Sequence, residues 1–591
     1  MTGKENSGRP PAASPSGSSE VVYSTDPADF HYMGLNVPCQ RACPARTNVP
    51  AYIRAGFEGD YALSYELNRQ VNLFPGVLGR ICSRPCEDSC RHGEKELGQP
   101  VNICHLKRAA ADLRPAGACY EQRLYAPRNQ TVGVVGAGPA GLAAAHDLAT
   151  LGFGVTIYEA LESPGGMLAF GIPEFRLPRE ILSAEINAIL RLGVRVEYGV
   201  KLGRDVTTTE LLAHHDAVLV AAGCYRANRL KVPGEDLEGV LSGLEFMMAV
   251  NAGNPPAVGR RVLVLGAGFT AFDCARTALR LGAEEISICL RRTEHDLKVT
   301  RDEIHEAKKE GIVFESLLTA ARILGEGSLS GVEFLRTHLA RDPASGRQKV
   351  EPIPDSEFTL EADTVIVATG QHAEDLGLSG GKRTDQGPGL AAAETENLYV
   401  CGDFLTGPAT VIEAVAAGRR AAEALARHLA GRKFREAAVA MEDTVLTDRS
   451  RTWDYLPRQE MPTLEPLAAR LSAYTHEVEK GLAPAEAHSE SQRCYLCYLH
   501  YEIDMNRCIY CRYCIDVAPR DCIKLVASLE LNEDGAVVGY RQTTLWREVA
   551  AVVIDNSRCI RCGECVRVCP VDCISVTRVE EVERMLDGGQ A

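Results

Sequence analysis

Two glycine-rich turns constrain the fold of this chain more than any other feature of its sequence. The first lies in TVGVVGAGPAGLAAAHDLATLGFGVTIYEA, which starts at Thr131 and has the order strand, turn, helix and second strand. In dinucleotide-binding units of this order, the glycines allow a tight turn and close approach to a pyrophosphate, which faces the helix N-terminus. An acid at the tip of the second strand accepts hydrogen bonds from a ribose. The positions predicted to bind a dinucleotide here are Gly136, Gly138, Pro139, Ala140, Gly141 and Glu159.

A second unit of the same order is RRVLVLGAGFTAFDCARTALRLGAEEISICLRR, with Gly266 and Gly268 in its turn. Ala271 at its third position is within the fingerprint. Its second strand ends in Arg291 and Arg292 instead of an acid. A guanidinium fork suits the 2′-phosphate of NADP, which a carboxylate would repel. The sequence therefore predicts FAD at the first turn and NADP(H) at the second, with NAD(H) as the alternative there.

Three strand ends are predicted to approach the bound nucleotides. The runs DAVLVAAG and DTVIVATG read as buried strands that end at Gly223 and Gly370, where the chain can pass beside a ligand. Gly402 and Asp403 follow a later strand, and a helix starts near Thr410. An acid there can bind the ribityl hydroxyls of a flavin, and the helix N-terminus faces the isoalloxazine. Because this strand is far along the chain from the first turn, the flavin domain is predicted to be split, with the NADP domain inserted in it.

The 22 cysteines gather mostly before residue 105 and after residue 493. Bunched cysteines in a chain of this size indicate metal or redox cofactors rather than a disulfide framework. Near the C-terminus, CIYCRYCIDVAP and CIRCGECVRVCP are typical of a two-cluster ferredoxin, in which the fourth cysteine of each motif binds the cluster of the other motif. One complete four-thiolate site is therefore predicted from Cys508, Cys511, Cys514 and Cys569.

The other C-terminal site lacks its fourth thiolate, because Ala518 stands at that position. Cys522 is the nearest replacement. However, Cys573 follows the fourth cysteine of the intact motif at the same distance as Cys522 follows Ala518, which favours the interpretation that Cys522 is only a feature of the repeated motif. Cys494 and Cys497, in RCYLC, are the alternative. A three-iron cluster or a non-thiolate ligand stays open, although we expect a full cluster completed by an extra cysteine. The three cysteines in question are Cys559, Cys562 and Cys565.

Residues from about Cys39 to Arg419 resemble the small subunit of NADPH-dependent glutamate synthase, whose relatives include the N-terminal half of dihydropyrimidine dehydrogenase. The shared motifs are GAGPAG, PGGMLAFGIPEFRLP, LGAGFTAFDCARTALRLGA and CGDFLTGPATVIEAVAAGRRAA. The resemblance implies that FAD takes hydride from NADPH and passes single electrons to 4Fe-4S clusters. It places Gly165, Gly166 and Met167 near the FAD. Thioredoxin reductase, a competing family, needs a Cys-x-x-Cys pair beside the flavin, and the middle of this chain has none.

In the resembled family a helical domain with two clusters precedes the flavin domain, and eight cysteines would complete both. The resemblance assigns Cys43, Cys82 and Cys86 to one cluster, and Cys104, near the place of that cluster's non-cysteine ligand in the family, is the candidate to complete it. Cys39 and Cys90 are left to a second cluster that lacks two partners. Zinc is a rival for thiolates at such spacings.

The predicted architecture is multidomain, with an α-helical iron–sulfur domain, two nested Rossmann-like α/β domains and a C-terminal α+β ferredoxin-like domain. The predicted ranges are a disordered leader at 1–25, the helical domain at 26–125, the split FAD domain at 126–245 and 365–435, the NAD(P)H domain at 246–364, a linker at 436–490 and the ferredoxin-like 4Fe-4S domain at 491–580.

The predicted function is electron transfer between NAD(P)H and iron–sulfur clusters by an FAD-dependent oxidoreductase, with no residue nominated as a catalytic acid or base. The expected setting is a hetero-oligomer, and the candidate partners are a 2-oxoacid:ferredoxin oxidoreductase, a formate dehydrogenase or ferredoxin. One alternative is the small subunit of glutamate synthase with a separate large subunit. Another is an iron–sulfur scaffold or sensor with a vestigial flavin.

Bulk composition excludes other classes of function. The net charge of −15, without a basic face, argues against nucleic acid as a partner. No apolar run is long enough to span a bilayer, and the Gly-, Ser- and Pro-rich start lacks the apolar stretch of a secretory signal. We therefore expect a cytoplasmic protein.

Overall fold

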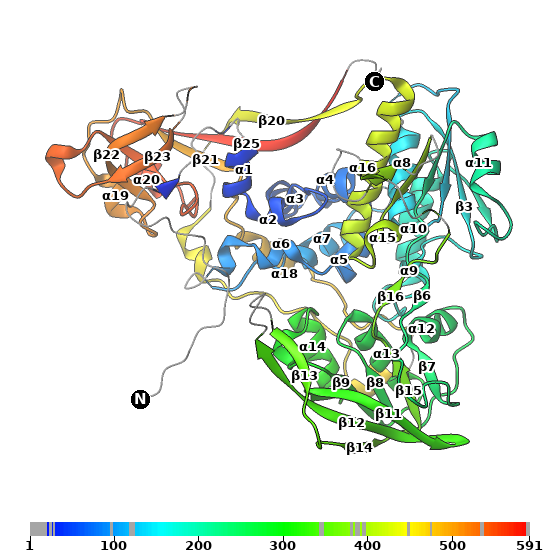
Figure 1. Ribbon diagram of the computed structural model, residues 1–591. Coiled ribbons are helices and arrows are strands. Elements are labelled where there is room, and N and C mark those ends of the chain that lie inside the picture. Colours follow the sequence, from blue (N-terminus) through cyan, green and yellow to red (C-terminus); the bar gives the residue numbers. More distant parts are fainter. Residues whose placement is uncertain are drawn as a thin grey trace, which may run out of the picture. The chain divides into compact units, whose positions relative to one another are not determined.

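The computed structural model divides the chain into two compact units. The nucleotide unit comprises residues 39–436, 456–494 and 583–591, and the ferredoxin unit comprises residues 1–38, 437–455 and 495–582. Figure 1 labels many of the helices and strands of both units. The structure describes residues 21–22, 27, 30–94, 98–117, 125–341, 348–376, 378, 382–383, 390–392, 397–445, 449–472, 475–531, 533 and 537–586.

A seven-stranded sheet in the order β17-β18-β19-β5-β2-β3-β4 carries the first glycine turn. The five neighbouring strands from β19 to β4 pair in parallel, whereas β18 and β17 extend the sheet at the β19 side with antiparallel pairing. Every residue of β5 and β19 is buried, because helices cover both faces of such a sheet. The strands are β2 (Thr131–Val135), β3 (Gly154–Glu159), β4 (Arg195–Tyr198), β5 (Ala217–Val220), β17 (Lys382–Arg383), β18 (Leu390–Ala392) and β19 (Leu398–Cys401).

A five-stranded parallel sheet in the order β10-β9-β8-β15-β7 carries the second glycine turn. Its strands lie between β5 and β19 in the sequence, so the second fold is nested in the first, and the predicted fold class is confirmed. They span residues 240 to 367, a few residues beyond the predicted 246–364 at each end. The strands are β7 (Val240–Ser242), β8 (Arg261–Leu265), β9 (Glu285–Leu290), β10 (Val313–Ser316) and β15 (Thr364–Val367).

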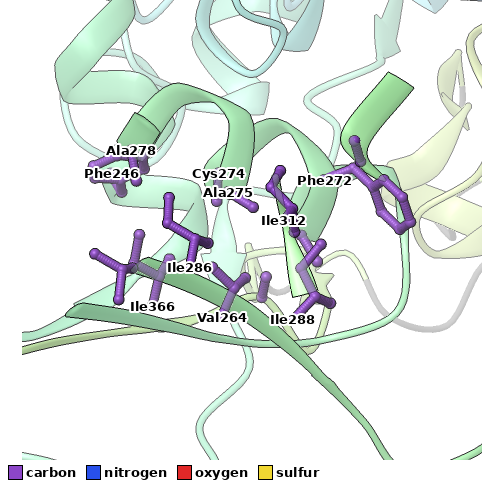
Figure 2. Packing of buried hydrophobic residues seen from close by; sticks show 14 of the residues in the cluster. Phe246, Val264, Phe272, Cys274, Ala275, Ala278, Ile286, Ile288, Ile312 and Ile366 are labelled. Carbon is purple, nitrogen blue, oxygen red and sulfur yellow. The ribbon is translucent and has the colours of Figure 1, made fainter. Parts of the chain in front are cut away.

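Alternating side chains of this sheet build two separate cores. On one face, Val264, Ile288 and Ile366 pack against Phe246 and Ala275, which come from helices α12 (Gly243–Asn251) and α13 (Phe269–Arg280), as Figure 2 shows. The opposite face packs against an antiparallel sheet, through apolar residues of both sheets. That sheet consists of β11 (Leu318–Glu326), β12 (Ser328–Arg341), β13 (Gln348–Pro352) and β14 (Phe358–Glu361).

Short helices form the cysteine-bearing front of the nucleotide unit. They are α2 (Pro38–Ala42), α3 (Val49–Phe57), α4 (Tyr61–Asn72), α5 (Pro75–Ile81), α6 (Pro85–Asp88) and α7 (Ile103–Asp112). Glu185, a buried residue of α10 (Arg179–Leu190), accepts hydrogen bonds from the backbone N–H groups of Gly76 and Val77 at 2.8 and 3.1 Å. This carboxylate caps the N-terminus of α5, where helices favour negative charge, and joins the helical front to the flavin fold.

The segment predicted as a linker, 436–490, carries regular structure. It includes most of β20 (Arg435–Asp443), the 3-10 helix η3 (Arg451–Tyr455), α17 (Leu467–Leu471) and the start of α18 (Pro484–Gln492). Helix α18 packs against α3 and α7 of the cysteine-bearing front. The boundaries of the predicted domains stay predictions.

The ferredoxin unit contains two similar halves, each with a cysteine loop, a short helix and a long strand. The helices are α19 (Tyr513–Val517) and α20 (Glu564–Arg567), and the strands that follow are β22 (Ile523–Leu531) and β25 (Ile574–Met585). One sheet has the order β1-β23-β22-β24, and the other has the order β20-β25-β21. The further strands are β21 (Leu499–Ile503), β23 (Val537–Gln542) and β24 (Ala551–Ile554).

Most of the predicted leader, residues 1–20, lies outside the described residues. Its end, Val21–Val22, forms strand β1, which pairs with β23 in the ferredoxin unit. Within the described ranges, every helix is too short or too polar to cross a bilayer.

Candidate functional site

The first glycine turn has no room for side chains at two of its positions. Gly136 has φ +101°, and a Cβ there would lie 2.6 Å from the carbonyl oxygen of Ala221. A Cβ on Gly141 would lie 1.9 Å from the carbonyl oxygen of Gly136. At Gly138, by contrast, the nearest atom to an added Cβ is 4.0 Å away. The turn therefore packs tightly on its inner side and leaves open space where a pyrophosphate would approach.

A cavity of about 670 Å³ opens beside this turn. Eleven of the predicted flavin-side residues line it: Gly136, Gly138, Pro139, Ala140, Glu159, Gly166, Met167, Gly223, Gly370, Asp403 and Thr410. Gly141, Gly165 and Gly402 support the wall instead. Gly165 donates its N–H to the Ala137 carbonyl at 2.8 Å, and a Cβ on Gly402 would lie 2.8 Å from the Cβ of Ala140. Thr410 caps the 20-residue helix α16 (Val411–Ala430), so that this helix points its N-terminus at the cavity.

Asp403 supplies a hydrogen-bond acceptor that has no protein partner among the described residues. Its Oδ1 is buried and unpaired, while its carboxylate accepts a hydrogen bond from the Ala409 N–H. Burial raises the pKa of Asp403 to about 6. A buried, unpaired acceptor at a cavity wall calls for a donor from a ligand, and the ribityl hydroxyls of FAD are such donors. The residues at this wall therefore fit FAD.

Glu159 has a structural task in addition to the predicted one. Its Oε2 accepts a hydrogen bond from the Ala137 N–H at 2.6 Å, and its Oε1 accepts one from the Leu161 N–H at 2.9 Å. These bonds tie the glycine turn to the end of β3. Since a carboxylate has about four lone-pair sites, Glu159 can still accept from a ribose hydroxyl in the cavity that it lines.

The second glycine turn borders a larger, basic cleft of about 1590 Å³. A Cβ on Gly266 would lie 2.3 Å from the Ala368 carbonyl oxygen, whereas no atom lies within 4 Å of an added Cβ on Gly268. The basic residues that line the cleft are Arg226, Arg229, Lys231, Arg291, Arg292, Lys349 and His372, and Asp296 is the one acidic residue in its described lining. Sequence reasoning found the arginine pair but missed Lys231 and Lys349. This excess of positive charge suits a nucleotide with a 2′-phosphate.

The two cavities meet. Gly268, Thr270 and Gly370 line both of them. Gly370 has φ +104°, which a residue with a side chain would adopt only with strain. The sequence predicted the glycines separately, but their position at a shared wall depends on how β15 and the second turn pack together.

An ion-pair network holds the PEFRLP loop, at residues 173–178, beside the flavin cavity. Arg176 donates from Nη1 to Asp273 Oδ1 at 2.7 Å and pairs through Nη2 with Glu303 Oε1 at 2.9 Å. Asp273, on α13, also lines the cavity, and burial raises its pKa to about 6. The network links the loop to the second nucleotide fold, and sequence reasoning missed it because the three residues are far apart in the chain.

Four front cysteines gather around a buried lysine. The Cys104 thiol hydrogen-bonds to the thiols of Cys82 and Cys86. Lys107, which is 3% exposed, interacts electrostatically with these three thiols and with that of Cys43. These are the three cysteines that the resemblance assigns to one cluster, together with Cys104, the candidate to complete it. Thiolates around an iron–sulfur core carry negative charge, which a buried ammonium offsets.

The segment that bears Cys494 lies against the segment that bears Cys90. Arg493, which is buried, donates from Nη2 to the Gln99 carbonyl oxygen at 2.6 Å and contacts the His92 ring at 3.3 Å. Cys39 is buried and Cys90 is half-buried in the same unit. Cys494 therefore lies in the nucleotide unit, in the segment that contacts His92 and Gln99.

The two C-terminal sites differ in exposure. One small pocket is lined by the four cysteines that the motif assigns to one site, and all four are partly exposed: Cys508, Cys511, Cys514 and Cys569. Cys573 lines the same pocket, with its Sγ 3.5 Å from that of Cys569. The other site consists of Cys559, Cys562 and Cys565, which are buried, and Cys522 lies with them. Cys497 is near this loop through its carbonyl oxygen, which accepts from Arg561 Nη2 at 3.2 Å.

Comparisons with known families agree with this arrangement. Residues 130–418 match the family described as pyridine nucleotide-disulphide oxidoreductase. Residues 33–117 match dihydropyrimidine dehydrogenase domain II with its 4Fe-4S cluster, and residues 507–573 match the 4Fe-4S dicluster domain. The matches confirm the predicted cofactors FAD, NADP and 4Fe-4S clusters.

Curated relatives cover most of the chain. The NADP(+)-dependent formate dehydrogenase subunit beta of Moorella thermoacetica is 36% identical over 78% of this chain and 71% of its own length. The NADPH-Fe(3+) oxidoreductase subunit beta of Geobacter sulfurreducens is 35% identical over 80% of this chain and 77% of its own length. The glutamate synthase [NADPH] small chain of Azospirillum brasilense is 33% identical over 68% of this chain and 89% of its own length. The chain is thus an FAD-dependent NADPH oxidoreductase with 4Fe-4S domains at both ends, and it belongs to the family of flavin and iron–sulfur subunits that includes the glutamate synthase small chain and the formate dehydrogenase subunit beta.

Proposed function

We propose that this chain relays electrons between NADPH, bound in the basic cleft, and a protein redox partner that docks at the exposed site of the ferredoxin unit. The observation that carries the proposal is the wall shared by the flavin cavity and the nucleotide cleft, at Gly268, Thr270 and Gly370. A nicotinamide and a flavin must be in contact for hydride transfer, and a shared wall allows that contact.

The chain's own residues act by position and charge. Gly138 and Gly268 leave space for pyrophosphates at the two helix N-termini, while Asp403 accepts from the flavin's hydroxyls. Arg291 and Arg292 bind the 2′-phosphate of NADPH at the edge of the cleft. When bound, FAD converts between two-electron hydride chemistry and one-electron transfer to clusters.

The front cysteines lie in the same unit as the flavin cavity, which suits them as the next centre in the relay. In this proposal Cys43, Cys82, Cys86 and Cys104 hold one 4Fe-4S cluster beside Lys107. A second front site takes Cys39 and Cys90, and Cys494 is proposed as an added ligand because Arg493 holds its segment against His92, near Cys90.

The ferredoxin unit offers an exit that a partner can reach. Around the partly exposed site of Cys508, apolar side chains face solvent: Ile509 is 58% exposed, Tyr513 is 56% exposed and Trp546 is 44% exposed. Exposed aromatic residues beside a redox centre favour a docked protein over a small substrate. Among the relatives, subunits of formate dehydrogenase and of an NADPH-Fe(3+) oxidoreductase align over more of this chain than the glutamate synthase small chain does.

This difference in coverage favours a partner of the formate dehydrogenase type, with a 2-oxoacid:ferredoxin oxidoreductase or ferredoxin as further candidates. The role of a small subunit beside a glutamate synthase large subunit is the second candidate function, supported by the match to the Azospirillum brasilense small chain over 68% of this chain. Proteins that co-purify with the tagged chain would distinguish these partners.

An anaerobic titration of the purified chain with NADPH, and separately with NADH, tests the relay. We expect absorbance to show reduction of the flavin, electron paramagnetic resonance to show reduction of clusters, and NADPH to act at lower concentration than NADH. A flavin that is reduced while every cluster stays oxidised would mean that electrons enter from the partner side. A chain whose flavin does not respond to either nucleotide would support the scaffold or sensor alternative instead.

A further inference from the structure

The buried C-terminal site is short of one ligand by the ferredoxin rule. Its loop supplies Cys559, Cys562 and Cys565, and the position that should supply the fourth thiolate is Ala518. The question is whether any described residue brings a replacement to this site.

Cys522 is held against the loop by its backbone. Its carbonyl oxygen accepts a hydrogen bond from the Asp555 N–H at 2.7 Å, and Asp555 in turn accepts from the Cys559 N–H at 3.1 Å. The residue before it, Asp521, has φ +48°, a left-handed turn that directs the chain into β22. Two backbone hydrogen bonds therefore fix Cys522 beside the start of the cysteine loop.

The Cys522 side chain points at the same three cysteines. Its thiol hydrogen-bonds to the Cys559 thiol and interacts electrostatically with those of Cys565 and Cys562. All four side chains are buried, each at most 9% exposed. Four buried cysteines whose thiols interact with one another match the four-thiolate ligand set of a 4Fe-4S cluster.

The intact half of the repeat shows what is special about Cys522. Cys573 repeats its backbone geometry: its carbonyl accepts from the Asp504 N–H at 2.8 Å, Asp504 accepts from the Cys508 N–H at 3.0 Å, and Asp572 has φ +47°. Its thiol, however, lies 3.5 Å from that of Cys569, the regular fourth ligand. The exposed site thus has two candidates for one position, and the buried site has one.

We propose that Cys522 is the fourth ligand of the cluster held by Cys559, Cys562 and Cys565, and that Cys573 is the matching but unused thiol of the other site. The repeat places a cysteine four residues after the regular ligand in both halves, so loss of the regular cysteine at position 518 leaves a thiol within reach. Comparison of the two motifs in the sequence favoured the interpretation that Cys522 is present only because the motif repeats. The contacts in the structure favour Cys522 as a cluster ligand.

Cys497 is the rival ligand in this unit. It is buried and approaches the same loop, but the contact runs through its carbonyl oxygen and the guanidinium of Arg561. Arg561 also donates to the Cys559 carbonyl oxygen and to the Leu499 carbonyl oxygen at 3.1 Å. The Arg561 side chain therefore joins the Cys497 backbone to the loop by hydrogen bonds, and it interacts electrostatically with the Cys497 and Cys559 thiols. The thiol-to-thiol hydrogen bond to Cys559 comes from Cys522.

The test measures iron content and spin state of the full-length holoprotein, without turnover, so that its outcome is independent of the proposed relay and partner. Cys522→Ala is expected to lose about one to four irons per chain and to show a three-iron signal after anaerobic oxidation, or to lose the cluster. The matched variant Cys573→Ala and the rival variant Cys497→Ala are expected to leave the iron of the C-terminal clusters unchanged. Ala518→Cys combined with Cys522→Ala is expected to restore the four-iron spectrum.

Two outcomes would overturn the proposal: a Cys522→Ala protein with unchanged iron and spectrum, or loss of this cluster in Cys497→Ala alone. Ala518→Cys in the otherwise unaltered chain keeps the test decisive if Cys522→Ala does not fold. We expect it to leave iron content unchanged, because the cluster is already complete. A gain of about one iron per chain would show that the site normally holds three irons.

Discussion

The two glycine turns of the nucleotide unit share a backbone and differ in the charges around them. In both turns a glycine packs against the carbonyl oxygen at the end of a neighbouring strand, Ala221 for Gly136 and Ala368 for Gly266. The first turn is flanked by the carboxylates of Glu159 and Asp403, and the second by the arginine pair at residues 291 and 292. The comparison teaches that the steric requirements of the backbone determine the dinucleotide-binding fold. The charges of a few side chains at the strand ends determine which dinucleotide binds.

The third position of each turn marks a further difference. In the second turn, the side chain of Ala271 is buried and has room for its Cβ. In the first turn, a Cβ on Gly141 would clash with the Gly136 carbonyl oxygen. The first helix, α8 (Pro139–Thr150), also packs closely on α16, where a Cβ on Gly418 would lie 2.1 Å from the Ala140 carbonyl oxygen. Helix α8 is therefore packed tightly on two sides.

The largest expected effect is the loss of stability and of FAD when a side chain is added to the tightly packed first turn. Gly141→Ala should displace α8, destabilise the nucleotide unit by about several kcal/mol and yield protein without FAD, because a Cβ at 1.9 Å from a backbone oxygen cannot be accommodated in place. The ratio of flavin to protein and the melting temperature measure it. The matched change Ala271→Gly should cost only about 1 kcal/mol and retain FAD. Retention of FAD by Gly141→Ala would show that the two turns tolerate the same residues.

A smaller effect is expected when the charge contrast is removed. Arg291→Ala combined with Arg292→Ala should raise the KM for NADPH by at least about 10- to 100-fold, which is the effect of losing one charge-assisted hydrogen bond worth about 1.5–3 kcal/mol. The KM for NADH should change little, because NADH lacks the 2′-phosphate. Arg229→Ala is the control: Arg229 lines the same cleft but pairs with Asp236. Equal losses for both nucleotides would argue against recognition of the 2′-phosphate by the pair.

The smallest effect is a pH dependence of FAD binding that only the acidic site should show. Burial raises the pKa of Asp403 to about 6, and hydroxyl donors bind its ionised form. FAD binding should therefore release a proton and weaken as pH falls through 6, by about tenfold between pH 7 and pH 5. Asp403→Asn should bind more weakly at pH 7 and lose this dependence, as flavin fluorescence titrations of the apoprotein would reveal. A profile shared by both proteins would place the titrating group elsewhere.

Much of this molecule follows from local sequence. The strand, turn and helix order of both nucleotide units, their nesting and the paired ferredoxin motifs could be predicted, because glycine turns and cysteine spacings act over a few residues. The arginine pair and Asp403 could be found in the same way, since each stands at the end of a recognisable strand. Cys43 and Cys104, predicted for one front cluster, both interact electrostatically with Lys107 in the structure.

The rest required the tertiary structure, because it depends on residues that are distant in the chain. Position in the sequence made Cys522 look like a by-product of the repeat, and only its backbone bond to Asp555 brings it to the cysteine loop. The wall shared by the two cavities at Gly268 and Gly370 arises where separate strands pack side by side. Sequence thus determined which cofactors this protein holds, through local sterics and charge; long-range packing decided which side chains meet at each site, because contacts between distant residues have no local signature.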